Sequence, residues 1–171
     1  TDTQSTTFKS GATALNLVSA GTDATNDNGV SLTGTALATL TVTGSEDVDV
    51  TANASKVLAT ADFSGSTAEE INFSASASTV AMTYKTAAGT STSGLTTGSG
   101  ADTITLGDLA DTVSGSGKGD DTITVGGGND TITDAGAGAD TITLGAGDDT
   151  VTSAGAGNHT ITGGAGNDNM T

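Results

Sequence analysis

The stretch GSGADTITLGDLADTVSGSGKGDDTITVGGGNDTIT, residues 98–133, contains four copies of one short phrase, and the phrase occurs eight times between residues 98 and 171. In seven copies an Asp lies two residues before a large apolar side chain. These positions are Asp102, Asp111, Asp121, Asp130, Asp140, Asp149 and Asp168, with His159 in the remaining copy. The spacings alternate between nine and ten residues, so two copies span nineteen. A fixed short period indicates a solenoid, in which each repeat stacks on the one before it.

Each copy divides into a glycine-rich turn and a three-residue strand. The central strand residues are Ile104, Val113, Ile123, Ile132, Ile142, Val151, Ile161 and Met170. Because side chains alternate across a strand, the flanking Thr residues point outward and the central residue inward. Such short strands need neighbours, and stacking turn upon turn provides two for each strand at about 4.8 Å. The sequence therefore predicts an all-β fold, with a parallel β-solenoid over residues 98–171.

Residues 1–97 contain short alternating runs such as LTVTG (40–44) and INFSA (71–75), which are typical of strands. Successive apolar centres are often eight to ten residues apart; they are Leu32, Val42, Val50, Leu58, Phe63, Phe73, Met82 and Leu95. Leu95 lies nine residues before Ile104, and Ser93 then occupies the Asp place. We interpret residues 1–97 as a degenerate, β-helix-like continuation of the coil with few metal ligands. A separate small β domain or sandwich is the alternative.

Composition sets limits on stability and partners. Leu, Ile, Val and Phe total 29 of 171 residues and the formal net charge is −16, which is typical of a disordered chain unless a cation is bound. Cys and Pro are absent and aromatic residues are 2%, so disulfides and a conventional aromatic core are not expected. Twenty acidic residues against four Lys disfavour nucleic acid and anionic membranes. No apolar stretch is long enough for a membrane span.

Residues nineteen apart stack in a solenoid of this period, which places the acidic side chains in two columns. We call Asp102, Asp121, Asp140 and His159 the first column, and Asp111, Asp130, Asp149 and Asp168 the second column. Carboxylates one strand spacing apart repel each other by about 1 kcal/mol per pair in water and about 3 to 4 at an effective dielectric constant of about 20. A hard divalent cation between turns would convert this repulsion into attraction.

The ligands available to such a cation are all oxygens. Besides the Asp carboxylates, the turn glycines allow close approach of backbone carbonyls; they are Gly100, Gly119, Gly128, Gly138, Gly147 and Gly166. Calcium accepts six to eight oxygens in adaptable geometry, whereas magnesium requires a tighter octahedron. Zinc is disfavoured because Cys is absent and His159 is the only His. We therefore predict several Ca²⁺ ions.

The phrases GSGADTIT, GKGDDTIT, GGGNDTIT, GAGADTIT and GAGDDTVT resemble the RTX nonapeptide G-G-x-G-x-D-x-U-x over about 74 residues. This resemblance implies a right-handed parallel β-roll, with calcium between successive turns, in a bacterial protein exported to calcium-rich surroundings. The whole chain, rich in Thr, Ala and Gly, also resembles bacterial surface-layer proteins that carry such repeats. No export signal of the kind usual for this family follows the repeats, which favours an excised or unusually exported chain.

The repeats depart from the family pattern at several places. The first Gly is usually replaced, and Leu106, Val125 and Leu144 then add a second inward apolar residue on alternate half-turns. Leu109 replaces the second Gly and weakens the site around Asp111, and His159 makes the gap beside Asp140 the weakest. About five gaps between stacked turns remain suitable for calcium. They are Asp102 with Asp121, Asp121 with Asp140, Asp111 with Asp130, Asp130 with Asp149, and Asp149 with Asp168.

Two further groups of residues have a structural and a functional interpretation. Residues that precede the columns could be auxiliary ligands, although Asp and Asn also favour turns; they are Asp120, Asn129, Asp148, Asn158 and Asn167. The Thr pairs of the T-x-T strands should form a regular outward array, similar to those of ice-binding β-solenoids; they are Thr103 and Thr105, Thr122 and Thr124, Thr141 and Thr143, and Thr160 and Thr162. Strand propensity alone also favours exposed Thr.

These observations predict a calcium-stabilised extracellular structural protein of the bacterial cell surface. End-to-end stacking into a homopolymer, a surface layer or a filament, is expected because the repeats stop at Thr171 without a polar cap, although truncation of a longer protein has the same signature. The alternatives are a calcium-binding repeat module of a larger secreted adhesin or toxin, and an ice-binding β-solenoid. A cell-surface glycan is a possible partner. No catalytic motif occurs, so an enzyme is not expected.

Overall fold

A computed structural model of the chain describes residues 6–8, 11–20, 28–134, 136–153 and 155–171. These residues form strands and connecting turns, without a helix. The even-numbered strands are β2 Ala14–Ser19, β4 Thr39–Gly44, β6 Thr60–Ser66, β8 Thr83–Thr86, β10 Thr103–Thr105, β12 Thr122–Thr124, β14 Thr141–Thr143 and β16 Thr160–Thr162. The odd-numbered strands are β1 Thr6–Phe8, β3 Asn28–Leu32, β5 Val48–Thr51, β7 Glu70–Ser74, β9 Ser91–Thr96, β11 Thr112–Gly115, β13 Thr131–Asp134, β15 Thr150–Ser153 and β17 Asn169–Met170.

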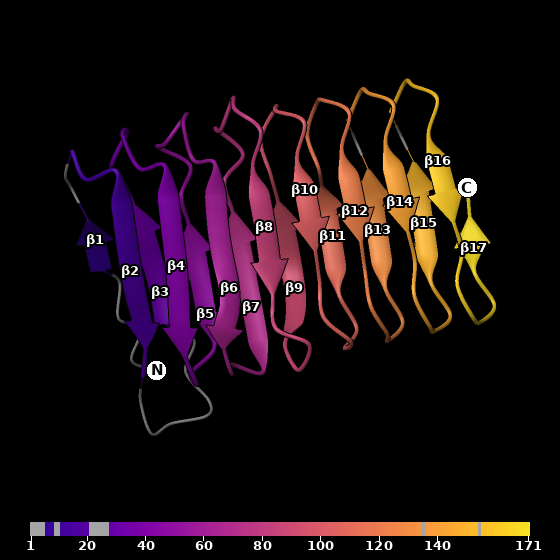
Figure 1. The fold of residues 1–171 in the computed structure, drawn as a ribbon, viewed down its shortest axis with the longest axis horizontal. Coiled ribbons are helices and arrows are strands. Elements are labelled where there is room, and N and C mark those ends of the chain that lie inside the picture. Colours follow the sequence, from indigo (N-terminus) through magenta and orange to yellow (C-terminus); the bar gives the residue numbers. More distant parts are fainter. Residues whose placement is uncertain (1–5, 9–10, 21–27, 135, 154) are drawn as a thin grey trace.

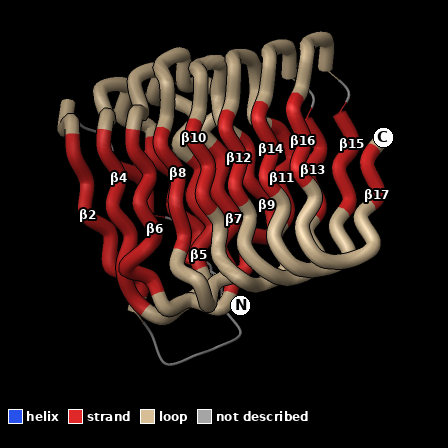
Figure 2. Tube along the Cα trace, turned by 45° about the vertical axis from the view of Figure 1, so that its right-hand side comes forward, coloured by secondary structure: helices blue, strands red, loops and turns tan. Residues whose placement is uncertain are grey.

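The strands form two parallel sheets that face each other. One sheet contains the odd-numbered strands and the other the even-numbered strands, each in chain order, and each strand is paired in parallel with the equivalent strand one coil away. Figure 1 shows the coils stacked from the N-terminal to the C-terminal end, and Figure 2 shows the turns that join the two sheets along both rims. The predicted parallel β-solenoid is confirmed, including the coils before residue 98, so the alternative of a separate sandwich is wrong.

Coil length differs between the two halves of the solenoid. Within the first strands, paired residues lie 20 to 25 positions apart, for example Val30 with Val50 and Leu15 with Leu40. In the repeats the separation is 19, as in the pairs Ile104 with Ile123 and Ile123 with Ile142. The expected boundary at residue 97/98 lies between β9 and β10, and both sheets continue across it.

The core is a ribbon of apolar side chains between the sheets. All eight apolar centres expected in the N-terminal half are buried, as are the inward residues of β10 to β15 and the additional Leu106, Val125 and Leu144. Parallel register places equivalent side chains one strand spacing apart, so that each coil covers the apolar residues of the next. The prediction of a second inward apolar residue on alternate half-turns is thereby confirmed.

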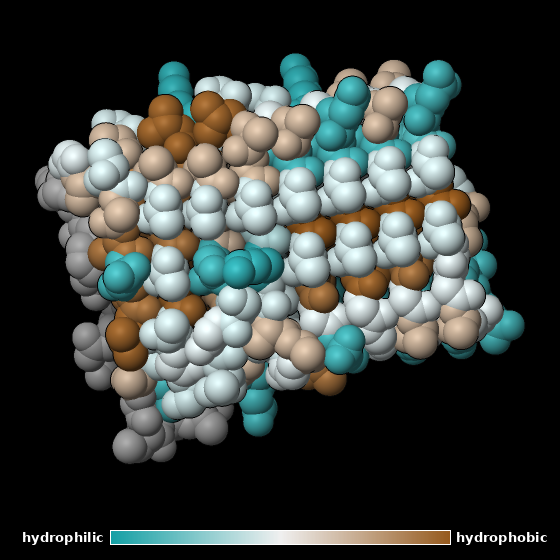
Figure 3. All heavy atoms as spheres, viewed as in Figure 1, coloured by the Kyte–Doolittle hydropathy of each residue, from teal (hydrophilic) through white to brown (hydrophobic). Residues whose placement is uncertain are grey.

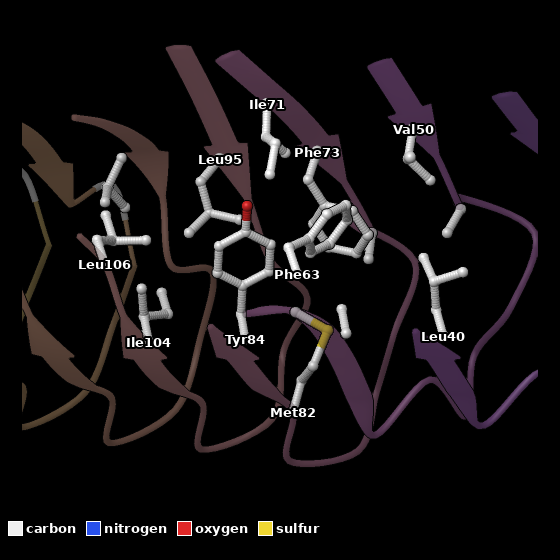
Figure 4. Close-up of a cluster of buried hydrophobic side chains, with 14 of the residues drawn as sticks. Leu40, Val50, Phe63, Ile71, Phe73, Met82, Tyr84, Leu95, Ile104 and Leu106 are labelled. Carbon is white, nitrogen blue, oxygen red and sulfur yellow. The ribbon is translucent and has the colours of Figure 1, made fainter. Parts of the chain in front are cut away.

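Three aromatic residues form one layer inside this ribbon, which the low aromatic content had not led us to expect. Phe63, Phe73 and Tyr84 come from β6, β7 and β8, and their ring centroids are 5.2 to 5.6 Å apart. All three are completely buried (Figure 4). Such contacts contribute about 0.5 to 1.5 kcal/mol beyond the burial of area. The N-terminal half therefore has a more conventional core than its composition suggests.

Buried hydroxyls occupy the rims of the N-terminal coils. Ser55 Oγ donates to the Leu37 carbonyl at 2.6 Å, and Ser78 Oγ donates to the Leu58 carbonyl at 2.9 Å. Thr90 Oγ1 donates to the Ala68 carbonyl in the same way. Each bond joins consecutive coils, and a bond of the same kind, from Thr97 Oγ1 to the Ser116 carbonyl, continues into the repeats. Among the described residues, no helix is long and apolar enough to cross a membrane.

Candidate metal centre

The two Asp columns lie at opposite rims of the solenoid, each at the turn that enters one sheet. First-column residues precede β10, β12 and β14, and second-column residues precede β11, β13, β15 and β17. Strands of the two sheets point in opposite directions in Figure 1, so their starting ends are at different rims. The register pairs Thr103 with Thr122 and Thr112 with Thr131, which places the preceding Asp residues directly above one another. The predicted stacking of the columns is confirmed.

Each column carboxylate is bonded to the backbone of the preceding coil. Asp121 Oδ1 accepts a hydrogen bond from the Asp102 N–H at 2.7 Å, and Asp140 Oδ1 accepts one from the Asp121 N–H at 2.8 Å. The second column repeats this pattern: Asp130, Asp149 and Asp168 accept from Asp111, Asp130 and Asp149. Sequence reasoning had missed this role, in which one carboxylate oxygen of each Asp accepts a backbone hydrogen bond from the coil before it.

The second carboxylate oxygen is buried without a hydrogen-bond partner. This holds for Oδ2 of Asp102, Asp111, Asp121, Asp130 and Asp149, and these residues are 1 to 2% exposed. Burial raises the pKa of Asp111, Asp121 and Asp130 to about 6, and the charges of neighbouring column residues act in the same direction. Hydrogen bonds from the backbone, and for Asp111 and Asp121 also from the side chains of Thr92 and Ser116, oppose this increase in pKa. The columns thus keep negative charge in a poorly solvated place, which is unfavourable unless a positive charge compensates it.

The predicted turn glycines are needed for close packing of consecutive turns. Gly119, Gly128, Gly147 and Gly166 have φ between 102° and 149°, a region that favours Gly. A Cβ on Gly138 would lie 1.8 Å from the Gly119 carbonyl oxygen, and one on Gly147 or Gly166 would lie 1.8 Å from the carbonyl oxygen nineteen residues earlier. Gly100 is similarly tight against the Val80 carbonyl oxygen, at 2.2 Å. The carbonyl oxygens of one turn therefore lie directly against the glycines of the next.

The residues that immediately precede the column residues in the sequence form a second ladder of hydrogen bonds at the surface. Asn129 Oδ1 accepts from the Asp148 N–H at 2.9 Å, and Asp148 Oδ1 accepts from the Asn167 N–H at 2.8 Å. Asp120 Oδ1 accepts from the Ala139 N–H at 2.8 Å. These bonds reach toward the following coil, opposite to those of the columns. The exposed Asp and Asn side chains thus connect turns, a role that neither the ligand nor the simple turn interpretation had included.

Two departures from the repeat have structural counterparts. Gly128, Gly147 and Gly166 share a positive φ, but Leu109, at the equivalent place, does not, because no described residue other than Gly has a positive φ. Leu109 is instead 43% exposed. His159 Nδ1 lies 3.0 Å from Asp140 Oδ2, so an imidazole occupies the gap that was expected to be weakest.

The expected place of Ser93 in the second column is wrong. Ser93 lies only eighteen residues before Asp111, and Thr92, nineteen residues before it, takes that place. The register shifts later in β9, where Leu95 pairs with Val113, eighteen positions away. Ser93 is exposed, whereas Thr92 is buried and its N–H donates to Asp111 Oδ1. On the other rim, the Met82 N–H donates to Asp102 Oδ1 at 2.8 Å. The first Asp of each column is therefore bonded to a coil that has no column Asp.

The residues present fit a hard cation between turns. Each gap offers carboxylate oxygens from two coils, including the buried Oδ2 atoms, together with backbone carbonyls, and this all-oxygen set suits calcium. No cluster of three or more His, Cys, Asp or Glu side chains occurs among the described residues. A site between turns would therefore combine a pair of carboxylates with backbone oxygens, as the stacked columns predict.

Comparison with known protein families identifies the repeats. The family model for the RTX calcium-binding nonapeptide repeat (4 copies) matches residues 95–113, 116–151 and 153–171. No match was found among curated proteins or among solved structures. Residues 95–171 thus carry RTX repeats, which imply calcium binding and are typical of secreted bacterial proteins. The match agrees with the part of the chain that contains both Asp columns.

Proposed function

We propose that the chain is a calcium-stiffened structural β-solenoid of the bacterial cell surface, which assembles with further copies into a surface layer or a filament. The observation that carries this proposal is the pair of buried Asp columns within the matched RTX repeats. Calcium between the turns neutralises the charge of neighbouring carboxylates and supplies the link between coils. The resulting body is long, regular and stiff, which suits a structural role.

The column residues perform two tasks in this function. Their Oδ1 atoms fix the backbone of the preceding coil, and their Oδ2 atoms provide negative charge toward the gaps. In a cytosol poor in calcium, repulsion between the carboxylates keeps the repeats loose and suitable for export. Millimolar calcium outside the cell then drives coil formation, so that folding follows secretion.

Circular dichroism with calcium and with EGTA tests the calcium requirement. Calcium should produce a β spectrum, and EGTA should reduce it for the repeat half of the chain. A spectrum that is indifferent to chelation contradicts the proposal.

Electron microscopy of the purified chain in calcium tests assembly, with EGTA as the control. Filaments or sheets support the structural role, whereas dispersed particles favour a calcium-binding module of a larger secreted adhesin or toxin.

A second candidate function, ice binding, rests on the Thr array. The first outward position of the even-numbered sheet is Thr in seven consecutive strands: Thr39, Thr60, Thr83, Thr103, Thr122, Thr141 and Thr160. A second file contains Thr105, Thr124, Thr143 and Thr162, and the exposed pairs appear as pale rows in Figure 3. The ion pair between Asp62 and Lys85 interrupts the second file in the N-terminal half.

A thermal hysteresis measurement tests this second function. An array that orders water should depress the freezing point, and Thr124→Tyr should abolish the effect because it disrupts the flat surface. Thr152→Tyr, an exposed residue on the other sheet, is the matched control and should leave the effect unchanged. Equal behaviour of the two variants, or no hysteresis in the native chain, contradicts ice binding.

A further inference from the structure

We infer that residues 28–97 form a metal-independent platform on which the repeat coils assemble in order, beginning at residue 98 and proceeding toward the C-terminus. This inference rests on the proposed calcium requirement of the repeats. It assigns different roles to the two halves of one continuous solenoid. It also gives the direction in which the solenoid grows.

The platform has a core that does not depend on carboxylates. The three largest fully buried side chains, Tyr84, Phe63 and Phe73, all lie in it. Leu40, Leu58, Ile71 and Met82 are also completely buried there. By contrast, no Asp or Glu between residues 28 and 97 is buried. The burial of large apolar side chains at about 1.5 to 3 kcal/mol each can stabilise this half without a cation.

Charge is distributed in the same way. Residues 28–97 contain six acidic residues and two Lys, and Lys85 forms an ion pair of 2.9 Å with Asp62. Residues 98–171 contain eleven Asp and a single Lys. The N-terminal coils are joined at the rims by neutral Ser and Thr hydroxyls, whereas the repeats carry buried carboxylates at the rims. Removal of calcium therefore creates uncompensated charge in the repeats and leaves the platform unchanged.

At the joint between the two halves, the edge strands β8 and β9 face the first repeat coil. Asp102 Oδ1 accepts from the Met82 N–H, and Asp111 Oδ1 accepts from the Thr92 N–H. Strand β8 pairs with β10 and β9 pairs with β11, so both edge strands of the platform receive the first repeat coil. The first Asp of each column therefore finds its backbone donor in a coil that needs no column Asp of its own.

The column bonds have a direction that orders the later coils. Every column Oδ1 reaches back to the coil before it, as Asp130 reaches to Asp111 and Asp149 reaches to Asp130. Because the platform is folded without metal, its N–H groups are available to the carboxylates of the first repeat coil, and each repeat coil then presents N–H groups to the next. In a solenoid, where each coil contacts only its neighbours, this dependence makes growth from the platform the favoured route.

Hydrogen exchange measured by mass spectrometry on the full chain tests the inference. In EGTA, strands β4 to β9 should retain their protection, and strands β10 to β16 should lose about 100-fold or more. When calcium is restored, pulse labelling should detect protection in β10 and β11 before β14 and β15. Loss of protection in both halves, or return of protection from the C-terminal strands first, would overturn the inference.

Two variants distinguish the joint from the columns in general. D102A/D111A removes both acceptors at the joint and should prevent calcium-induced protection throughout the repeats, while residues 28–97 stay protected. D149A is the matched control and should affect only the coils near β13, β15 and β17. Equal loss in the two variants would overturn ordered growth.

The same measurement separates this inference from the proposed function. Repeat strands that stay protected in EGTA would contradict the calcium requirement, and D102A/D111A would then still test the platform. In that case, a platform requires that the variant lose protection in the repeats and keep it in residues 28–97. Protection that is unchanged in both halves of the variant would overturn the inference as well.

Discussion

At the scale of single residues, a column Asp combines two functions that are usually separate. In Asp130, Oδ1 accepts the Asp111 N–H at 2.8 Å as a neutral acceptor could, whereas the buried Oδ2 carries the charge that a cation would balance. The hydrogen bond contributes to the turn with or without metal. The charge is unfavourable without metal and favourable with it.

Replacing Asp130 with Asn should separate these functions. The Asn side chain keeps an oxygen acceptor for the Asp111 N–H but removes the charge, so thermal stability in EGTA should rise and calcium binding in the two adjoining gaps should be lost. Asp130→Ala removes the acceptor as well and should be less stable than the Asn variant by about 1 to 3 kcal/mol. Melting by circular dichroism and calorimetric calcium titration measure the two effects. Identical behaviour of the two variants contradicts the dual role.

His159 offers a test in the opposite direction. Its Nδ1 lies 3.0 Å from Asp140 Oδ2, in a column where every other member is Asp. His159→Asp should restore the missing carboxylate and add one bound calcium ion per chain, whereas His159→Asn should add none. Equilibrium dialysis with radioactive calcium gives the stoichiometry. An unchanged ion count in the Asp variant would show that the gap beside Asp140 is unsuitable for another reason.

At the scale of elements, the turns depend on glycine more strictly than the strands depend on any single side chain. Gly147 has a φ of 149°, and a Cβ there would lie 1.8 Å from the Gly128 carbonyl oxygen. Since the coils are stacked in register, that contact cannot open without separating two turns. The strands are more tolerant, because the inward position from β10 to β15 is Ile in four strands and Val in two.

Gly147→Ala should therefore destabilise the calcium-loaded chain by at least about 1 to 3 kcal/mol through backbone strain alone. Gly115→Ala is the matched control, because a Cβ at Gly115 meets nothing within 4 Å. That variant should lie within about 0.5 kcal/mol of the native chain. Differential scanning calorimetry in calcium compares the two. A similar fall in melting temperature for both variants would contradict this account of the turns.

The repeats could be read from the sequence because one rule governs every coil there. A constant nineteen-residue period fixes the register, and the register alone places Asp121 on Asp102 and Ile123 on Ile104. The sequence could not show that Oδ1 reaches back to the preceding coil, because either direction satisfies the same spacing. The exposed ladder of Asn129 and Asp148 was undetermined for the same reason.

The N-terminal half followed the general pattern but not its details. Apolar centres such as Phe63 and Phe73 were identified as inward, since burial depends on alternation within a strand. Registers could not be predicted, because coil lengths vary there and the pairing of β7 and β9 contains a shift. Thr92, rather than Ser93, is the neighbour of Asp111, because Thr92 lies one full nineteen-residue period before it.

At the scale of the whole molecule, charge decides when the solenoid is stable. The formal net charge is −16, and the column carboxylates are among the most buried polar groups. In the absence of metal, folding must bring these carboxylates together and remove them from water. Protonation should therefore be able to replace calcium as the means of neutralising the columns.

Stability without metal should accordingly increase as the pH falls. The pKa of Asp111, Asp121 and Asp130 is about 6 in the folded chain, above the usual value of 3.8 for an Asp side chain, so the folded state binds more protons between these values. The resulting stability is fully present below pH about 4 and is lost as the pH rises through about 6. Thermal melts in EGTA at pH 4, 5, 6 and 7 measure this trend. In calcium the trend should be weaker, and a metal-free chain that is most stable at pH 7 would contradict the buried columns.

The constant period of the repeats also has a consequence for size. Insertion or deletion of one nineteen-residue coil adds or removes one rung in each sheet and changes the long dimension by about 4.8 Å. The two broad faces, the rims and the register of all other coils would keep their form. Duplication of a short gene segment can thus change the length of this molecule in small equal increments.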